Sequence, residues 1–175
     1  MKTMIIYSSQ TGFTKKYAEW IAKELDGEML SLKEAKNKPD SYFEVFDAIV
    51  YGGWNMGGKI VDSEWFLAKA SGWKQKKLAV YCVGASPVEN PGVEKVLSDL
   101  LTEEQKEYIK AFYCPGGLDY AKMKLPSKLM LKALSSMLNK KKDATEEEKK
   151  MVEMLSKSYD ISDSKYAVAV ADYLK

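Results

Sequence analysis

The chain contains no histidine and no arginine among its 175 residues. Histidine is the commonest general base near neutral pH and the commonest metal-ligating side chain. Its absence excludes hydrolytic mechanisms of the Ser-His and Cys-His types and disfavours a zinc site. A phosphate site in this chain is expected to use hydroxyls and backbone amides, which need no arginine.

Cysteine is scarce as well, since the chain has only Cys82 and Cys114. Both fall in predicted strands and are flanked by apolar or aromatic residues, so we expect two buried free thiols. Their spacing does not favour a disulfide, a metal pair or a redox C-x-x-C motif.

No apolar run reaches the length of a membrane span, and the segment Met1–Thr3 enters a strand without a secretory apolar region. We therefore expect a cytoplasmic protein. With 46% hydrophobic and 30% charged residues, the chain is typical of one globular domain covering residues 1–175. The net charge of +2 gives no reason to expect a nucleic-acid partner.

The most informative motif follows the first predicted strand, 4–8. There a cluster of hydroxyl side chains surrounds Gly12, and an amphipathic helix is predicted over 13–25. Amides at a helix N-terminus bind anions, and the hydroxyls of Ser9, Thr11 and Thr14 can add donors. The motif matches neither G-x-x-x-x-G-K-[ST] nor G-x-G-x-x-G, and it favours a monophosphate. The alternative is a Ser/Thr-capped helix start that binds nothing.

Strands and helices alternate along the chain, which predicts a parallel sheet with helices on both faces. A loop is expected over 33–41, and capping boxes open helices at Thr102 and Thr145. The last helix is expected to be capped by Asp163 or Ser164. The other predicted strands are 28–32, 47–53, 78–83 and 109–114, and the other predicted helices are 63–70, 92–101, 126–139 and 166–174.

Three predicted strand ends carry distinctive loops: Gly52–Lys59, Gly84–Pro87 and Pro115–Gly117. Ligands of such sheets bind beyond the carboxyl ends of the strands. The first loop suits a planar ring, because glycines let the chain lie flat and Trp54 offers a stacking face. A peptide at Gly57 or Gly58 could flip without a Cβ penalty. The alternative is a mobile glycine loop with a half-exposed tryptophan.

The pattern Ser-x-Thr-Gly-x-Thr after the first strand resembles the FMN-phosphate loop of flavodoxins. The segments 51–59 and 112–120 resemble a flavodoxin subgroup that includes the menaquinone-dependent protoporphyrinogen dehydrogenases. The resemblance implies an α/β flavodoxin-like, doubly wound five-stranded sheet of order 2-1-3-4-5, with a loop-helix insertion over 115–160. It also implies non-covalent FMN, with the flavin ring at the Trp54 loop. A flipped peptide at Gly57 or Gly58 could then offer a carbonyl to the flavin N5–H in the semiquinone state. The candidate cofactor-binding residues are Ser9, Gln10, Thr11, Gly12, Phe13, Thr14, Gly53, Trp54, Asn55, Met56, Gly57, Gly58, Gly84, Ala85, Ser86, Gly116 and Gly117.

Two functions remain open. The first is an electron carrier that serves a redox partner protein and needs no catalytic residue of its own, because the flavin carries the chemistry. The second is an FMN-dependent oxidoreductase acting on a small planar substrate, a quinone or a porphyrinogen. A phosphoacceptor receiver is disfavoured, because Ser8-Ser9 and Gly52-Gly53 stand where that fold needs acidic residues.

The lysine-bearing helix predicted over 126–139 has an apolar side. We expect that side to pack on the sheet with its lysines in solvent. Contact with a membrane surface near a quinone is the less favoured interpretation.

Overall fold

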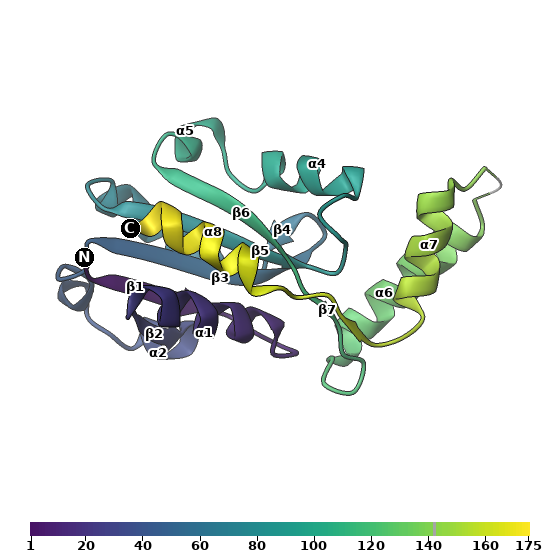
Figure 1. The fold of residues 1–175 in the computed structure, drawn as a ribbon, viewed down its shortest axis with the longest axis horizontal. Coiled ribbons are helices and arrows are strands. Elements are labelled where there is room, and N and C mark those ends of the chain that lie inside the picture. The colour runs from purple at the N-terminus through teal and green to yellow at the C-terminus, as the bar shows by residue number, and fades with distance from the viewer. Residues whose placement is uncertain (142) are drawn as a thin grey trace.

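The computed structural model describes residues 1–141 and 143–175; Lys142, one of the lysines that follow the predicted helix 126–139, lies outside them. Five parallel strands form the central sheet in the order β2-β1-β3-β5-β6, and β4 pairs antiparallel with β3 (Figure 1). Among the parallel strands this is the predicted order 2-1-3-4-5, so the α/β doubly wound fold is confirmed. The strands are β1 (Thr3–Tyr7), β2 (Glu28–Ser31), β3 (Ala48–Met56), β4 (Lys59–Ile60), β5 (Lys77–Gly84) and β6 (Ile109–Pro115).

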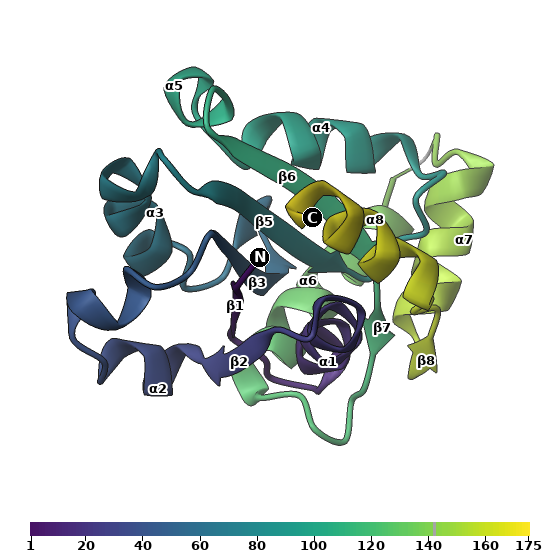
Figure 2. The same cartoon turned by 60° about the vertical axis from the view of Figure 1, so that its left-hand side comes forward.

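Alternating side chains of the central strands point to opposite faces of the sheet, and both faces are buried. In β1, Met4 and Ile6 join one core cluster while Ile5 joins the other. The first face is covered by α2 (Leu32–Lys36), η1 (Asp40–Phe43), α3 (Glu64–Ala70), η2 (Ser71–Trp73) and α4 (Pro91–Asp99). The second is covered by α1 (Phe13–Leu25) and α8 (Ser164–Leu174), which Figure 2 shows side by side. The short α5 (Glu103–Lys106) precedes β6.

A helical hairpin interrupts the chain between β6 and α8. It enters through β7 (Gly117–Leu118) and leaves through β8 (Tyr159–Asp160), which pair antiparallel. Its helices are α6 (Leu125–Asn139) and α7 (Glu146–Leu155). Figure 1 shows both helices beyond the carboxyl ends of the strands, away from the sheet. The insertion therefore lies at the edge where ligands of such sheets bind.

The structure corrects the expected packing of α6. The apolar side of this helix was expected to cover the sheet, but the one buried residue of the helix is Ser127. Leu131 and Leu138 pack on a small satellite cluster that includes Leu118 and Leu155. The residues Leu125, Leu129, Met130, Leu134 and Met137 are exposed instead.

Several local features differ from the sequence-based expectations. The loop expected over 33–41 overlaps most of α2 and the start of η1, and α2 is opened by a capping box between Ser31 and Glu34. Strand β3 continues through Met56, so Trp54 and Asn55 belong to a strand rather than a loop. The predicted capping boxes at Thr102 and Thr145 and the cap at Asp163 are confirmed.

Cys82 and Cys114 are buried free thiols, as the sequence predicts. Burial raises the pKa of the Cys82 thiol to about 12 and also raises the pKa of Cys114, so neither is a ready nucleophile at neutral pH. Within the described ranges, no helix is long and apolar enough to cross a membrane.

Tyr17 of α1 makes hydrogen bonds to the end of β6 and to the start of α8. Its hydroxyl donates to the carbonyl of Pro115 at 2.6 Å and accepts from the N–H of Asp163 at 3.2 Å. Tyr17→Phe leaves the buried Pro115 carbonyl and the half-buried Asp163 N–H without this bond, so we expect a loss of roughly 1–3 kcal/mol in the free energy of unfolding. Urea unfolding measures it. The control Tyr173→Phe, at a side chain 37% exposed, should change stability by less than about 0.5 kcal/mol. Equal losses would contradict this role for Tyr17.

Candidate functional site

The phosphate-binding motif forms a tight turn at the start of α1. Gly12 caps the helix with a left-handed φ of 103°, which glycine adopts without strain, and its N–H donates to the Ser9 hydroxyl at 3.2 Å. The first helical bond runs from the Lys16 N–H to the Gly12 carbonyl at 2.9 Å. The N–H groups of Phe13 and Thr14 therefore have no acceptor in their own helix and face the turn. The helix dipole adds favourable potential for an anion there.

The hydroxyls near this turn have different roles. Thr14 is buried, and its carbonyl accepts from the Tyr81 hydroxyl at 3.2 Å, which fixes the first turn of α1 on the sheet. Thr11 is half-buried at the tip of the turn. The Ser8 hydroxyl instead donates to the Asp62 carboxylate at 2.9 Å. Thr11 and Thr14 are therefore better placed than Ser8 to meet an anion.

The glycine-rich segment after β3 is a β-hairpin. Gly57 and Gly58 form its turn with φ values of 63° and 83°, and positive φ at both central residues is typical of a type I′ turn. The Asn55 side-chain carbonyl accepts from the Gly58 N–H at 3.0 Å and braces the turn. Trp54 pairs with Val83 of β5 and is half-buried, so its ring lies at the carboxyl edge of the sheet.

The loop after β5 is held by two tyrosines. The Tyr113 hydroxyl donates to the Ser86 carbonyl at 2.8 Å and accepts from the Ser86 N–H at 3.2 Å. The Tyr159 hydroxyl donates to the Ala85 carbonyl at 2.6 Å, and burial raises the pKa of Tyr159 to about 12, so it stays protonated. A Cβ on Gly84 would lie 2.1 Å from the Tyr113 hydroxyl, which explains the glycine there.

The phosphate turn, the hairpin after β3 and the loop after β5 meet around one cavity of about 100 Å³ at the carboxyl edge of the sheet. It brings together ten of the residues that the sequence singled out. These are Gln10, Thr11, Phe13, Thr14, Trp54, Asn55, Met56, Gly84, Ala85 and Gly117.

The other predicted residues lie around this cavity without lining it. Ser9 and Gly12 line an open groove on the outer side of the phosphate turn, and Ser86 lines a separate cavity toward α7. Gly53 is buried in β3, where a Cβ would lie 2.6 Å from Ile60, and Gly116 is buried against Val83. Gly57 and Gly58 form the open end of the hairpin.

Sequence reasoning missed one wall of the cavity. Met123, Ser127, Met130 and Leu131 of the insertion line it, together with Val83 and Leu118. The apolar periodicity of α6 is the signal that could have found them, but it was assigned to packing on the sheet.

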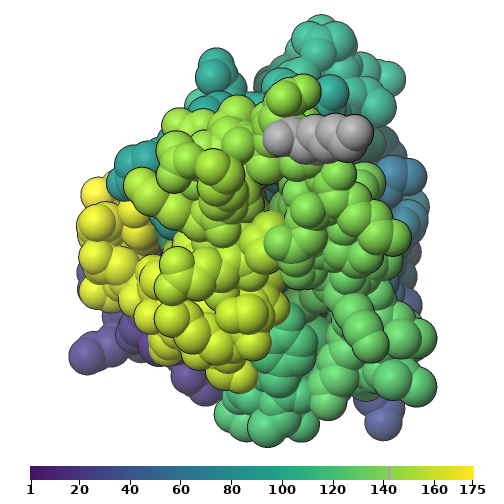
Figure 3. Space-filling view, turned by 90° about the vertical axis from the view of Figure 1, so that its right-hand side faces the viewer, coloured from purple at the N-terminus to yellow at the C-terminus, as the bar shows by residue number. Residues whose placement is uncertain are grey.

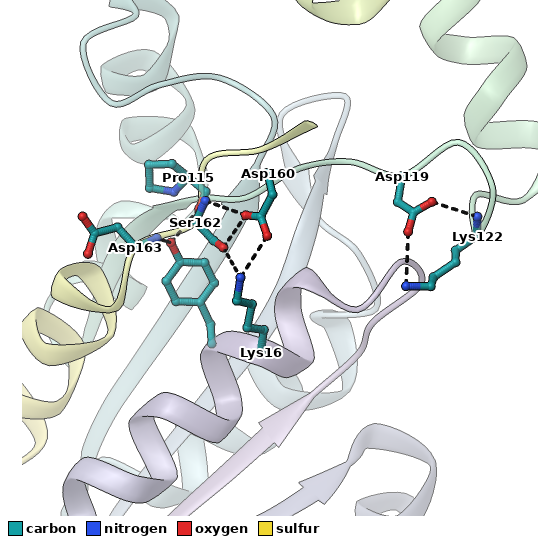
Figure 4. Close-up of polar contacts among 8 residues, drawn as sticks. Lys16, Pro115, Asp119, Lys122, Asp160, Ser162 and Asp163 are labelled. Atoms are coloured by element: carbon teal, nitrogen blue, oxygen red, sulfur yellow. Dashed lines mark hydrogen bonds and ion pairs between the residues drawn. The ribbon is translucent and has the colours of Figure 1, made fainter. Parts of the chain in front are cut away.

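Polar contacts hold the insertion against α1 (Figure 4). The Lys16 ammonium lies 2.9 Å from the Asp160 carboxylate and 2.8 Å from the Ser162 hydroxyl. Partial burial opposes ionisation of Asp160, but hydrogen bonds from Ser162 and from the Lys16 ammonium lower its pKa below the usual value. Lys122, 3.2 Å from Asp119, likewise lowers the pKa of Asp119.

One further hydrogen bond joins the insertion to the phosphate turn. The Lys124 N–H donates to the Gln10 side-chain carbonyl at 3.0 Å. The turn and the start of α6 therefore form one continuous rim around the cavity.

No aspartate, glutamate or lysine is among the described residues that line the cavity. The site therefore offers hydrogen-bond donors, an aromatic face and apolar walls, but no side chain suited to general acid-base catalysis. Such a site can position a ligand that carries its own chemistry.

The family model described as "Flavodoxin domain" matches residues 4–145. No curated protein matches the chain. A WrbA-like flavodoxin from Agrobacterium tumefaciens is 18% identical, with 54% of this chain and 64% of that chain covered and a TM-score of 0.42. A flavodoxin from the Archaea is 11% identical, with 99% of each chain covered and a TM-score of 0.44. A flavoprotein from Lactobacillus acidophilus NCFM, solved with FMN, is 19% identical, with 65% and 91% covered and a TM-score of 0.38.

Proposed function

This chain belongs to the flavodoxin domain family, and from that premise we propose that it binds FMN non-covalently and transfers electrons through it. One observation carries the proposal: the phosphate turn, the Trp54 hairpin and the Gly84 loop line a single cavity. The whole chain, 1–175, acts in this proposal as one FMN-binding domain with residues 115–160 inserted before α8.

The phosphate of FMN would be held at the start of α1. The N–H groups of Phe13 and Thr14 point toward the turn, and the hydroxyls of Thr11 and Thr14 add donors. This donor set fits a phosphomonoester in a chain that has no arginine. No acidic side chain belongs to the turn, so nothing in it repels a dianion.

The flavin ring would lie beside Trp54 and the backbone of Gly84 and Ala85. The cavity volume of about 100 Å³ is below the roughly 300–1,000 Å³ of typical small-molecule pockets, so a three-ring system needs more room. The insertion is the wall that can give way, because Met130 and Leu131 belong to a helix that does not pack on the sheet. FMN binding therefore includes a shift of these side chains.

FMN supplies one- and two-electron transfer when bound, and this chain supplies binding, orientation and exclusion of water. Apolar contacts from Val83, Leu118 and Met123 would limit water at the ring. The Gly57–Gly58 turn can reorient a peptide without a Cβ penalty and so present a carbonyl or an N–H to the ring edge.

The protein is expected to be yellow, or to become yellow with added FMN, and its flavin absorbance should bleach with dithionite. Absorbance titration with FMN measures the affinity. Riboflavin is the matched control, because it lacks the phosphate and should bind much more weakly. A colourless protein that takes up no added FMN would refute the proposal.

A second candidate function is oxidation of a planar quinone- or porphyrinogen-type substrate. The apolar wall that Met123, Met130 and Leu131 add to the cavity favours it, since such a wall suits a flat apolar ligand. Anaerobic turnover of protoporphyrinogen with a quinone acceptor tests this alternative, and absence of turnover leaves the electron-carrier function.

A further inference from the structure

Helix α6 has two apolar faces. One face packs on α7 and the base of the insertion through Leu131 and Leu138. On the other, Leu125, Leu129 and Met137 are 67%, 58% and 63% exposed. These three residues repeat at spacings of four and eight, so they share one side of the helix with Ala133. This second face is called the outer α6 face. Figure 3 shows the insertion to which it belongs, in green, at the surface of the molecule.

The charge around the outer α6 face has one sign. The sequence from 121 to 142 contains seven lysines and no aspartate or glutamate. The remaining 20 lysines of the chain stand against 25 acidic residues. The net charge of +2 is therefore unevenly distributed: positive charge is concentrated in the segment 121–142, and the rest of the chain carries a net charge of −5.

Part of this positive charge is not neutralised by ion pairs. Lys122 pairs with Asp119 and Lys141 pairs with Glu148. Lys124, Lys128, Lys132 and Lys140 make no ion pair with any described residue. Lys128 and Lys132 follow one edge of the outer α6 face, because they are offset from Leu125 and Leu129 by three residues. An apolar strip edged by unpaired lysines is typical of helices that lie in the surface of an anionic bilayer.

We propose that the outer α6 face docks the protein on an anionic lipid bilayer, with the leucine and methionine side chains entering the headgroup region and the lysines on the anionic headgroups. The net negative charge of the rest of the chain would be repelled by the same surface, which fixes the orientation. Because Met130 and Leu131 of the same helix line the cavity, the docked protein holds its cavity close to the lipid.

Two other occupants fit this face less well. A second copy in a symmetric dimer would bring like lysines together, which opposes association. Protein–protein interfaces are enriched in tryptophan, tyrosine and arginine at their centres, and the outer α6 face has none of these residues. The proposal is independent of FMN, since it rests on the insertion alone; colourless protein that binds vesicles would leave it standing.

Co-sedimentation of the full chain tests the proposal, using vesicles of equal parts phosphatidylcholine and phosphatidylglycerol and vesicles of phosphatidylcholine alone. We expect about tenfold or stronger partitioning onto the anionic vesicles, weakened by added salt. Leu129→Ser should lower partitioning about tenfold. Its matched control is Val45→Ser, at a side chain 59% exposed on another part of the surface, which should leave partitioning unchanged.

A second pair of variants tests the contribution of the lysines to vesicle binding. Lys128→Gln with Lys132→Gln should lower partitioning about tenfold, whereas Lys23→Gln with Lys36→Gln on α1 and α2 should change it little. Thermal unfolding checks that each variant is folded. Equal sedimentation with both vesicle types, or equal effects of Leu129→Ser and Val45→Ser, would overturn the proposal. The proposal would also be overturned if the wild type did not bind the vesicles and instead formed a dimer in size-exclusion chromatography that Leu129→Ser dissociated.

Discussion

FMN affinity should fall by roughly two to four orders of magnitude when Thr11 and Thr14 are both replaced with alanine. A hydrogen bond to a charged group contributes about 1.5–3 kcal/mol, and each 1.4 kcal/mol is about a tenfold change in the dissociation constant. Thr14 is buried below the turn, so little water can replace its hydroxyl. Quenching of flavin fluorescence on titration measures the affinity.

Two controls separate a phosphate effect from a general loss of structure. Thr102→Ala removes a capping threonine of α5 and should cost about 1 kcal/mol of stability while leaving FMN affinity unchanged. Riboflavin has no phosphate, so its weak binding should be similar in the double variant and the wild type. If the double variant lost riboflavin and FMN binding equally, the two threonines would be acting on the ring site or the fold.

Gly52→Ala should destabilise the fold by about 3 kcal/mol or more. A Cβ at Gly52 would lie 1.8 Å from Cζ of Tyr81, a side chain that is fully buried between α1 and the sheet. Overpacking a dense core typically costs about 1–3 kcal/mol, and here the ring also holds the Thr14 carbonyl below the phosphate turn. Loss of FMN affinity should therefore accompany the loss of stability.

Gly72→Ala is the matched control for this substitution. A Cβ there meets nothing within 4 Å, and its φ is not in the left-handed region, so stability should change by less than about 0.5 kcal/mol. Chemical denaturation of both variants gives the comparison. Similar unfolding midpoints would show that the sheet accommodates a side chain at Gly52 and would contradict the packing argument.

Local sequence signals predicted local structure well. The pairs Thr102–Gln105 and Thr145–Glu148 are capping boxes, as expected, because each involves residues only three positions apart. The same signal is present at Ser31–Glu34, but the expected strand 28–32 took in Ser31 and the expected loop 33–41 took in Glu34. The strand order followed from a family resemblance and was confirmed by the observed pairing.

Contacts between distant residues were harder to predict. The glycines at 52 and 53 were read as room for a planar ligand, yet a Cβ at Gly52 would meet Tyr81 and one at Gly53 would meet Ile60. That role depends on strand register, which places Gly52 opposite Tyr81. Likewise, the periodicity of α6 predicts an apolar side but does not predict which surface it packs against. The sequence therefore did not reveal that the insertion forms one wall of the cavity.

The pairing of β7 with β8 has a consequence for how this domain can be altered. Leu118 and Tyr159 are direct partners across the antiparallel pair, so the chain leaves the domain and returns to it at neighbouring points. Antiparallel partners have Cα atoms about 4.5–5.5 Å apart, a gap that a two-residue turn can close. The hairpin of α6 and α7 is thus a detachable module: it can be shortened, exchanged or grafted onto a related domain while the five parallel strands keep their connections. The insertion, which limits access to the cofactor, can then change in sequence and length independently of the sheet and loops that hold the cofactor.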